Sequence, residues 1–110
     1  QQLARLRERG VLIVGSGNIV HNLRMVSNGK PYDWNIEFDA WTAAQMTDRN
    51  YDELANFLKL GNLATMAHPT HDHYLPLLYS AGAVDSKDNM TTFNDSLTMG
   101  SISMRSVIWS

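Results

Sequence analysis

Three of the four histidines lie within six residues of one another, in the stretch HPTHDHYLPL at residues 68–77. They are His68, His71 and His73, and Asp72 stands between the last two. Neutral imidazole is the commonest protein ligand of metals such as zinc and iron, and it transfers protons near neutral pH. The stretch therefore predicts a metal site, a proton relay or, most plainly, an exposed polar turn before an apolar helix.

The spacing of these histidines separates the alternatives only in part. Two ligands on one helical face usually stand four residues apart, whereas the separations here are three, two and five. Pro69 favours an extended or turn conformation around His68, while His73 stands at the start of the next helix, where Asp72 can cap the helix or orient an imidazole. The local pattern therefore favours His73 as a ligand over His68 and His71, for which exposed loop positions are the simpler interpretation.

The fourth histidine, His21, follows a glycine-rich turn in the segment VLIVGSGNIVH. The dinucleotide-binding fingerprint needs a third glycine where this chain has Val20. A nucleophile elbow needs serine in the middle of G-x-S-x-G, whereas Ser16 lies directly between two glycines. What remains is a tight turn that presents Asn18 and His21, and a structural role for His21 fits the pattern as well as a functional one.

The elements that must position these side chains follow an α/β pattern. Residues 2–9 are expected to form the last turns of a helix that ends at Gly10. Val11–Val14 form a continuous apolar run, typical of a strand buried on both faces in a parallel sheet. Open α/β sheets bind ligands at the carboxyl ends of their strands, and the glycine-rich turn lies at such an end. The expected fold is thus a mainly parallel sheet flanked by helices.

Three further helices are expected: one that begins near Asp33, one over residues 51–61, and one over residues 73–83 with Pro76 in its first turn. Residues 85–96 are polar and are expected to form a loop, and the alternating pattern from Ser96 onward predicts one or two strands. The positions expected to face the core are Trp34, Phe38, Trp41, Leu54, Phe57, Leu58, Leu97, Met99, Ile102, Met104 and Val107.

Length and composition restrict the class of protein. The chain has 110 residues, a formal net charge of −2 and no cysteine. Its basic residues cluster only in the first nine positions, so we expect no nucleic-acid partner. No apolar run reaches the roughly 18 residues that a membrane span needs. The lack of cysteine excludes disulfides and thiolate ligands and fits a reducing compartment, so we expect a cytoplasmic location.

Four motifs, in order, resemble the carboxyl-terminal half of the DOPA-type extradiol dioxygenases, which belong to the class III ring-cleaving superfamily. The motifs are GSGNIVHNL at residues 15–23, YDWNIEFDAW at 32–41, HPTHDHYLPLLYSAGA at 68–83 and GSISMRSVIW at 100–109. The resemblance covers nearly the whole chain, and four motifs in the right order are far more specific than any one of them.

The resemblance implies roles for individual residues. His21 would lie beside the metal, either as a ligand or as the acid/base group that acts on the catechol. His73, in the PTxxHYLPLL segment, would be a metal ligand. The positions of His68 and His71 often carry other residues in such proteins. Candidates for the substrate pocket or for contacts behind the ligands are Asn18, His68, His71, Asp72 and Tyr74.

The resemblance also implies that the site is incomplete. Family members contribute two further histidine ligands from an amino-terminal half, near GHGSP and SAHW motifs, and neither motif occurs here. We therefore expect residues 1–110 to be the carboxyl-terminal part of a single catalytic α/β domain. The other ligands would come from the absent amino-terminal half or, alternatively, from another chain. The chain alone is expected to be inactive.

The function implied by the resemblance is extradiol cleavage of a catecholic ring, such as that of DOPA, by molecular oxygen. Fe(II) would be the active metal, and Zn(II) is a plausible bound metal. Two alternatives stay open. One is a non-enzymatic metal-binding or interaction domain on the same scaffold, since folds host unrelated functions. The other is a zinc hydrolase, because histidine-rich sites accept zinc readily.

Overall fold

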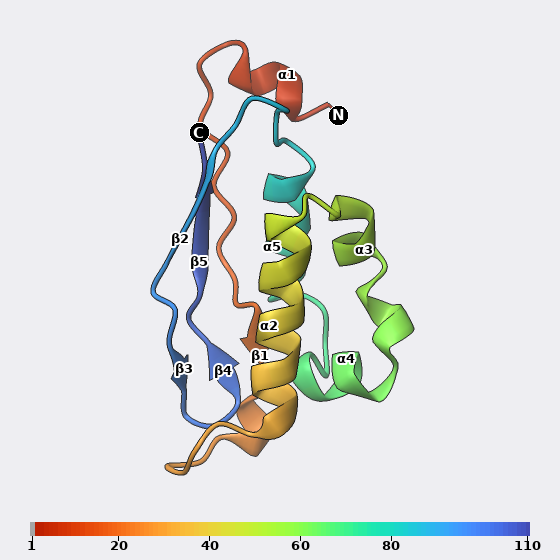
Figure 1. The fold of residues 1–110 in the computed structure, drawn as a ribbon, viewed down its shortest axis with the longest axis vertical. Helices are drawn as coiled ribbons and strands as arrows, with labels where there is room; N and C mark the ends of the chain where they lie inside the picture. The colour runs from red at the N-terminus through yellow and green to blue at the C-terminus, as the bar shows by residue number, and fades with distance from the viewer. Residues whose placement is uncertain (1) are drawn as a thin grey trace.

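The computed structural model describes residues 2–110. The molecule is elongated, with principal dimensions of 45 × 26 × 22 Å. Helices lie along one side of two small sheets (Figure 1). Helix α1 (Ala4–Arg7) and the end of strand β5 (Ser106–Trp109) lie at the same end of the molecule. None of the helices within residues 2–110 has the length and apolar character needed to cross a bilayer.

The helices agree with the sequence where their signals are local. They are α1 (Ala4–Arg7), α2 (Asp33–Thr47), α3 (Tyr51–Ala55), α4 (Asn62–Ala67), α5 (Leu75–Ala81) and the 3₁₀ helices η1 (Leu23–Met25) and η2 (Phe57–Leu60). α2 begins at Asp33 as predicted, and Pro76 lies in the first turn of α5 as predicted. The helix predicted over residues 51–61 is instead divided into α3 and η2. Gly61 follows η2 with a φ of +61°, which glycine adopts without strain.

The sheets differ from the prediction, because every strand pair within residues 2–110 is antiparallel. β1 (Val20–His21), β4 (Ile102–Ser103) and β3 (Leu97–Thr98) form a three-stranded sheet in the order β1-β4-β3. β2 (Met90–Phe93) pairs with β5 (Ser106–Trp109) in a second sheet. β2 lies inside the predicted loop 85–96, since its polar sequence is held as a strand by pairing with β5 and not by an apolar pattern.

The apolar run Val11–Val14 is the clearest correction. It forms no strand, and Val11, Leu12 and Val14 are 44%, 80% and 78% exposed. Figure 1 shows the segment running between β5 and the helices without joining either sheet. An apolar run becomes a buried strand only when a neighbouring strand pairs with it, and residues 2–110 offer no such partner.

The core lies between α2 and the shorter helices α3, α4 and α5. Phe38, Leu54 and Tyr74 are fully buried, and the ring of Tyr74 lies 4.3 Å from that of Phe57 and 5.7 Å from that of Phe38. The inward positions are thus confirmed for Phe38, Leu54, Phe57 and Ile102, while Trp34, Trp41, Leu97 and Val107 are only partly buried.

Three predicted core residues are exposed: Leu58, Met99 and Met104. Leu58 lies on the tighter 3₁₀ turn of η2, where Phe57 occupies the inward position. Met99 lies in a turn with a φ of +51°, which breaks the alternation expected of a continuous strand.

Candidate active site

The structure brings His21 and His73 together across 52 positions of sequence. Their rings stack with centroids 3.5 Å apart and planes 7° apart. His21 ends β1, where its pairing with Ile102 of β4 fixes its backbone, and His73 lies in the turn that precedes α5. The two residues that the sequence singled out most strongly therefore form one site.

The glycine-rich segment at residues 15–17 allows this contact. The backbone N–H of Asn18 donates a hydrogen bond of 2.9 Å to the carbonyl of His73. A Cβ at Gly17 would overlap that same carbonyl, and a Cβ at Gly15 would press on the carbonyl of Pro76. The two glycines thus allow close backbone packing against the start of α5. The predicted tight turn is not formed, because residues 11–18 contain no turn or bend, and a segment without regular secondary structure carries Asn18 towards β1 and His21.

Asp72 lies beside His73. Its Oδ2 is 3.2 Å from Nδ1 of His73, and its Oδ1 accepts a 2.5 Å hydrogen bond from the Thr70 hydroxyl. That hydroxyl lowers the pKa of the Asp72 carboxyl, so the carboxylate is charged at neutral pH. A carboxylate on Nδ1 fixes the tautomer that leaves Nε2 of His73 free to bind a metal.

Burial lowers the pKa of His21, and the nearby His73 lowers it further. His21 is therefore a neutral imidazole at neutral pH, although it remains partly exposed. A neutral imidazole can accept a proton from a bound molecule and return it later in a reaction. The environment of His21 is thus suited to acid/base chemistry as well as to metal binding.

His68 is not the exposed loop residue that its sequence pattern predicted. It is 1% exposed, and its Nε2–H donates a 2.6 Å hydrogen bond to the carbonyl of Ile19. Its ring lies 5.5 Å from that of Phe38 and 5.2 Å from that of Tyr74, and burial lowers its pKa to about 4. His68 therefore supports the chain just ahead of β1, and no local sequence signal predicts this burial.

The other two candidates lie away from the paired rings. His71 is exposed and presents its ring at 5.4 Å to the edge of Phe57. Tyr74 is buried, its hydroxyl donates a 2.8 Å hydrogen bond to the carbonyl of Leu54, and burial raises its pKa. Tyr74 contributes to the core beneath His68, where its hydroxyl is already occupied.

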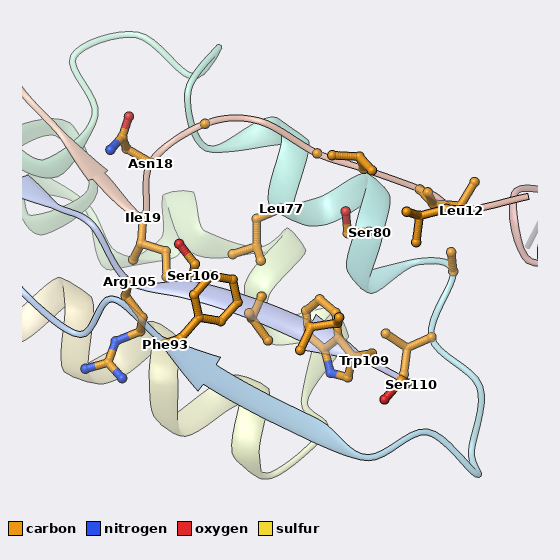
Figure 2. A pocket seen from close by; sticks show the side chains of 18 of the residues that line it. Leu12, Asn18, Ile19, Leu77, Ser80, Phe93, Arg105, Ser106, Trp109 and Ser110 are labelled. Carbon is orange, nitrogen blue, oxygen red and sulfur yellow. The ribbon is translucent and has the colours of Figure 1, made fainter.

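A groove of about 580 Å³ opens beside His73 and Asn18 (Figure 2). Arg105, which sequence reasoning did not single out, lines the groove and donates from Nη2 to Oδ2 of buried Asp39 at 2.9 Å. The Ser103 hydroxyl donates to the same carboxylate at 2.6 Å. The sequence signal for Arg105 was its position within the GSISMRSVIW motif. Its ion-pair partner, Asp39, lies far away in the sequence on α2.

Residues 2–110 do not form a metal site by themselves. They contain no group of three or more His, Cys, Asp or Glu side chains placed to hold one ion. His21 and His73 are nitrogen donors that fit iron or zinc. Lone pairs of imidazoles lie in the ring planes, and two stacked rings have nearly parallel planes. In this arrangement, an ion can lie in line with a nitrogen lone pair of one ring more readily than with lone pairs of both rings at once.

Residues 1–105 match the protein family described as the catalytic LigB subunit of aromatic ring-opening dioxygenase. The chain is 41% identical over 113 residues to the 4,5-DOPA dioxygenase extradiol of Escherichia coli strain K12, a match that covers 97% of this chain and 41% of that protein. It is 31% identical over 109 residues to the 4,5-DOPA dioxygenase extradiol of Beta vulgaris, covering 94% of this chain and 39% of that protein.

Among solved structures, the crystal structure of an uncharacterized protein from Escherichia coli K12 is similar to this chain, with a TM-score of 0.85 and 40% identity. The match covers 96% of this chain and 46% of that one. The chain thus spans about two fifths of the length of the curated relatives that it matches.

Proposed function

Because the chain belongs to the family of the catalytic LigB subunit of aromatic ring-opening dioxygenases, we propose that it carries part of the active site of a metal-dependent extradiol dioxygenase. The observation that supports this proposal is the stacked pair of His21 and His73 on the two motifs that the sequence singled out. The substrate class would be a catechol, with DOPA as the first compound to test, since two relatives are named for that activity.

In the proposed site His73 is the metal ligand. The Asp72 carboxylate lies on Nδ1 of its ring, so Nε2 is the nitrogen available for coordination. Fe(II) is the proposed metal for activity, and Zn(II) also suits an imidazole donor. When bound, Fe(II) would supply Lewis acidity toward the catechol oxygens and redox chemistry toward dioxygen.

His21 is the proposed acid/base group, and metal binding by His21 is the alternative within the same site. It is neutral at neutral pH because burial and His73 lower its pKa. It can therefore take a proton from a catechol hydroxyl and return it as the ring opens. The stacked geometry favours this division of roles, because two parallel rings do not aim at one ion equally well.

The groove beside His73 has mostly apolar side chains such as Leu77, Val107 and Trp109, and Asn18 lies at its rim. An apolar wall suits an aromatic ring, and the Asn18 amide adds a polar contact; this amide already donates a 3.1 Å hydrogen bond to the carbonyl of Ser103. We also propose that further histidine ligands come from an amino-terminal part of the same protein, and that the protein is cytoplasmic, which the absence of cysteine supports.

The test is oxygen uptake, measured with absorbance, on a chimera in which this chain replaces the matched segment of the Escherichia coli relative. The chimera is loaded anaerobically with Fe(II) and given DOPA and simple catechols. We expect oxygen uptake matched by a yellow ring-opened product. His73→Ala should lose both metal and activity, whereas His21→Ala should keep most of the metal and lose activity by roughly 10²–10⁴-fold.

His71→Ala is the matched control, because His71 is an exposed histidine of the same segment that contacts only the edge of Phe57 among the rings described. It should keep both metal and activity. Full metal binding and ring cleavage by His73→Ala would contradict the site assignment. A metal-loaded chimera that consumes no oxygen with any catechol would contradict the proposed function and favour a non-oxygenase role.

A further inference from the structure

Asparagine is followed directly by glycine once in the sequence, at Asn28 and Gly29. Both residues are exposed, in a bend between η1 and α2. Asparagine is thermolabile because the backbone nitrogen of the next residue can attack its side-chain carbonyl carbon. Glycine obstructs that attack least, since it has no Cβ and adopts the widest range of backbone conformations. The pair therefore combines the sequence and the exposure that this reaction needs.

The space around the attacking nitrogen is open. A Cβ placed on Gly29 would have the Ser27 hydroxyl oxygen, at 3.6 Å, as its close neighbour. The N–H of Gly29 donates to that same hydroxyl across 3.3 Å, which is longer than an ordinary hydrogen bond of this kind. The nitrogen is therefore weakly held, and no packed side chain has to move before a ring closes between the two residues.

The loop that carries the pair is fixed at both ends on one turn. The backbone N–H of Ser27 donates a 2.9 Å hydrogen bond to the carbonyl of Met99, and that of Tyr32 donates a 3.0 Å hydrogen bond to the carbonyl of Gly100. Met99 and Gly100 join β3 to β4, at the end of the molecule where the loop lies in Figure 1. Residues 28–30 thus face solvent between two anchors, and a reaction there requires no unfolding of the core.

We propose that Asn28 is a site of spontaneous deamidation, and that its isoaspartate product loosens this loop from the turn between β3 and β4. Hydroxide removes the proton from the Gly29 nitrogen, which attacks Cγ of Asn28. The bond between Cγ and the side-chain nitrogen breaks as the new bond forms, and ammonia leaves with a proton from water. Water then opens the cyclic imide at either carbonyl, which yields aspartate or isoaspartate. The inference goes beyond the proposed function, because the reaction needs neither metal nor catechol.

The two products differ in what they do to the loop. Aspartate adds a negative charge to an exposed side chain and leaves the main chain unchanged. Isoaspartate adds a carbon to the main chain between Ser27 and Tyr32, whose distance apart is set by their hydrogen bonds to the turn. The longer path has to bulge or strain these anchors. The carbonyl of Gly100 also accepts a 3.0 Å hydrogen bond from the side chain of Asn35, which holds the turn itself in place.

The first test is incubation of the metal-free 110-residue chain in heavy-oxygen water, followed by digestion and mass spectrometry. The peptide that contains Asn28 should lose ammonia and gain one heavy oxygen, at a rate that rises in proportion to hydroxide concentration. Asn94, which is exposed in a loop but is followed by Asp95, is the internal control and should remain an amide over the same period.

Gly29→Ala tests the attacking nitrogen. The added methyl group fits the folded chain, since its nearest neighbour would be 3.6 Å away, but it obstructs ring closure. Deamidation should therefore slow by about tenfold or more. The rate in the folded parent chain should lie within about tenfold of the rate in the urea-unfolded chain, because the loop is already open to solvent. An intact Asn28 in the folded chain, with rapid reaction in the unfolded chain, would overturn the proposal.

The second test is amide hydrogen exchange of the isoaspartate form, separated from the parent chain by ion exchange. The amides of Ser27 and Tyr32 should exchange at least about tenfold faster than in the parent, because their hydrogen bonds to the turn are weakened. Asn28→Asp is the matched control: it carries the same added charge on a normal main chain and should exchange as the parent does. Unchanged exchange of both amides in the isoaspartate form would contradict the proposed link between loop and turn.

Discussion

The four histidines of the chain have the same imidazole group but lie in three different environments. His68 is fully buried against Phe38 and Tyr74, and His71 is exposed. His21 and His73 stack on each other and are partly exposed, and His73 lines the groove. An imidazole that is partly exposed and neutral can bind a metal or exchange protons with a ligand, whereas a fully buried one is confined to holding its neighbours. Burial therefore excludes His68 from such chemistry, and their pairing distinguishes His21 and His73 from His71.

His68 makes the stability of the chain depend on pH. Its pKa is lowered from 6.5 to about 4 by burial, so between these values the unfolded state binds a proton that the folded state does not. Its contribution is complete above pH 6.5 and is lost as the pH falls towards 4, by up to ~3 kcal/mol. Urea unfolding between pH 7.5 and 4.5 should show this slope, and His68→Phe should flatten it.

His71→Phe provides the comparison for that measurement. His71 is exposed, so replacing it removes an imidazole but not the buried one, and the slope should persist. An identical pH dependence in the parent chain and in His68→Phe would contradict the buried neutral state of His68.

Asp72 is expected to tune metal binding through His73. Its carboxylate is 3.2 Å from Nδ1 of His73 but its side chain is 68% exposed, so the effect should lie at the lower end of the range for such partners. Asp72→Ala in the chimera should weaken metal affinity by about tenfold, measured by competition with a chelating dye. Asp52→Ala, which removes an exposed acid from α3, should leave the affinity unchanged.

At the scale of elements, the site depends on a loop packed against the start of a helix. The segment at residues 15–18 has no regular secondary structure, and it is positioned by glycines that lie close to the backbone of His73 and Pro76. β1 then pairs with β4 for only two residues, so the packing of residues 15–18 against the start of α5, more than the sheet, sets the approach of His21 to His73.

Gly17→Ala should therefore separate the two rings. A Cβ at this position would overlap the carbonyl of His73, and relieving that overlap requires residues 15–18 to move away from the start of α5. We expect a loss of about 1–3 kcal/mol in unfolding free energy and the loss of magnetisation transfer between the two histidine rings in NMR spectra. Gly29→Ala, whose nearest neighbour would be 3.6 Å away, should change neither quantity.

The difference between local sequence signals and contacts with distant segments explains which elements could be predicted from the sequence. α2 and α5 were predicted with their starts because Asp33 and Pro76 are local signals. β2 and the unpaired run Val11–Val14 were not, because strand pairing depends on a distant segment that the local sequence does not contain. The stacked pair of histidines was located by motif, whereas the burial of His68 and the ion pair of Arg105 depend on residues of α2 and could not be read locally.

At the scale of the whole molecule, the chain has a complete helical core and an open side. The packed helices bury Phe38, Leu54 and Tyr74, while the side formed by Val11–Gly17 and β5 leaves apolar residues in solvent. The paired histidines lie where this open side meets the helices, since His73 both lines the groove and precedes α5. A partner that covers the open side would therefore also enclose the histidines.

Metal affinity should reveal this division of the site between the chain and the rest of the domain. Two imidazoles that stack in parallel form a poor chelate, and residues 2–110 add no third ligand to them. The 110-residue chain should thus bind Zn(II) weakly, and the chimera should bind it at least about a hundredfold more tightly, because ligands held on one scaffold bind at high effective concentration. Calorimetric titration of both proteins at pH 7.5 measures the difference.

His73→Ala should abolish this difference in affinity, and His71→Ala should preserve it. Equal affinities in chain and chimera would instead mean that residues 1–110 complete a metal site by themselves, and the open side would then need another explanation.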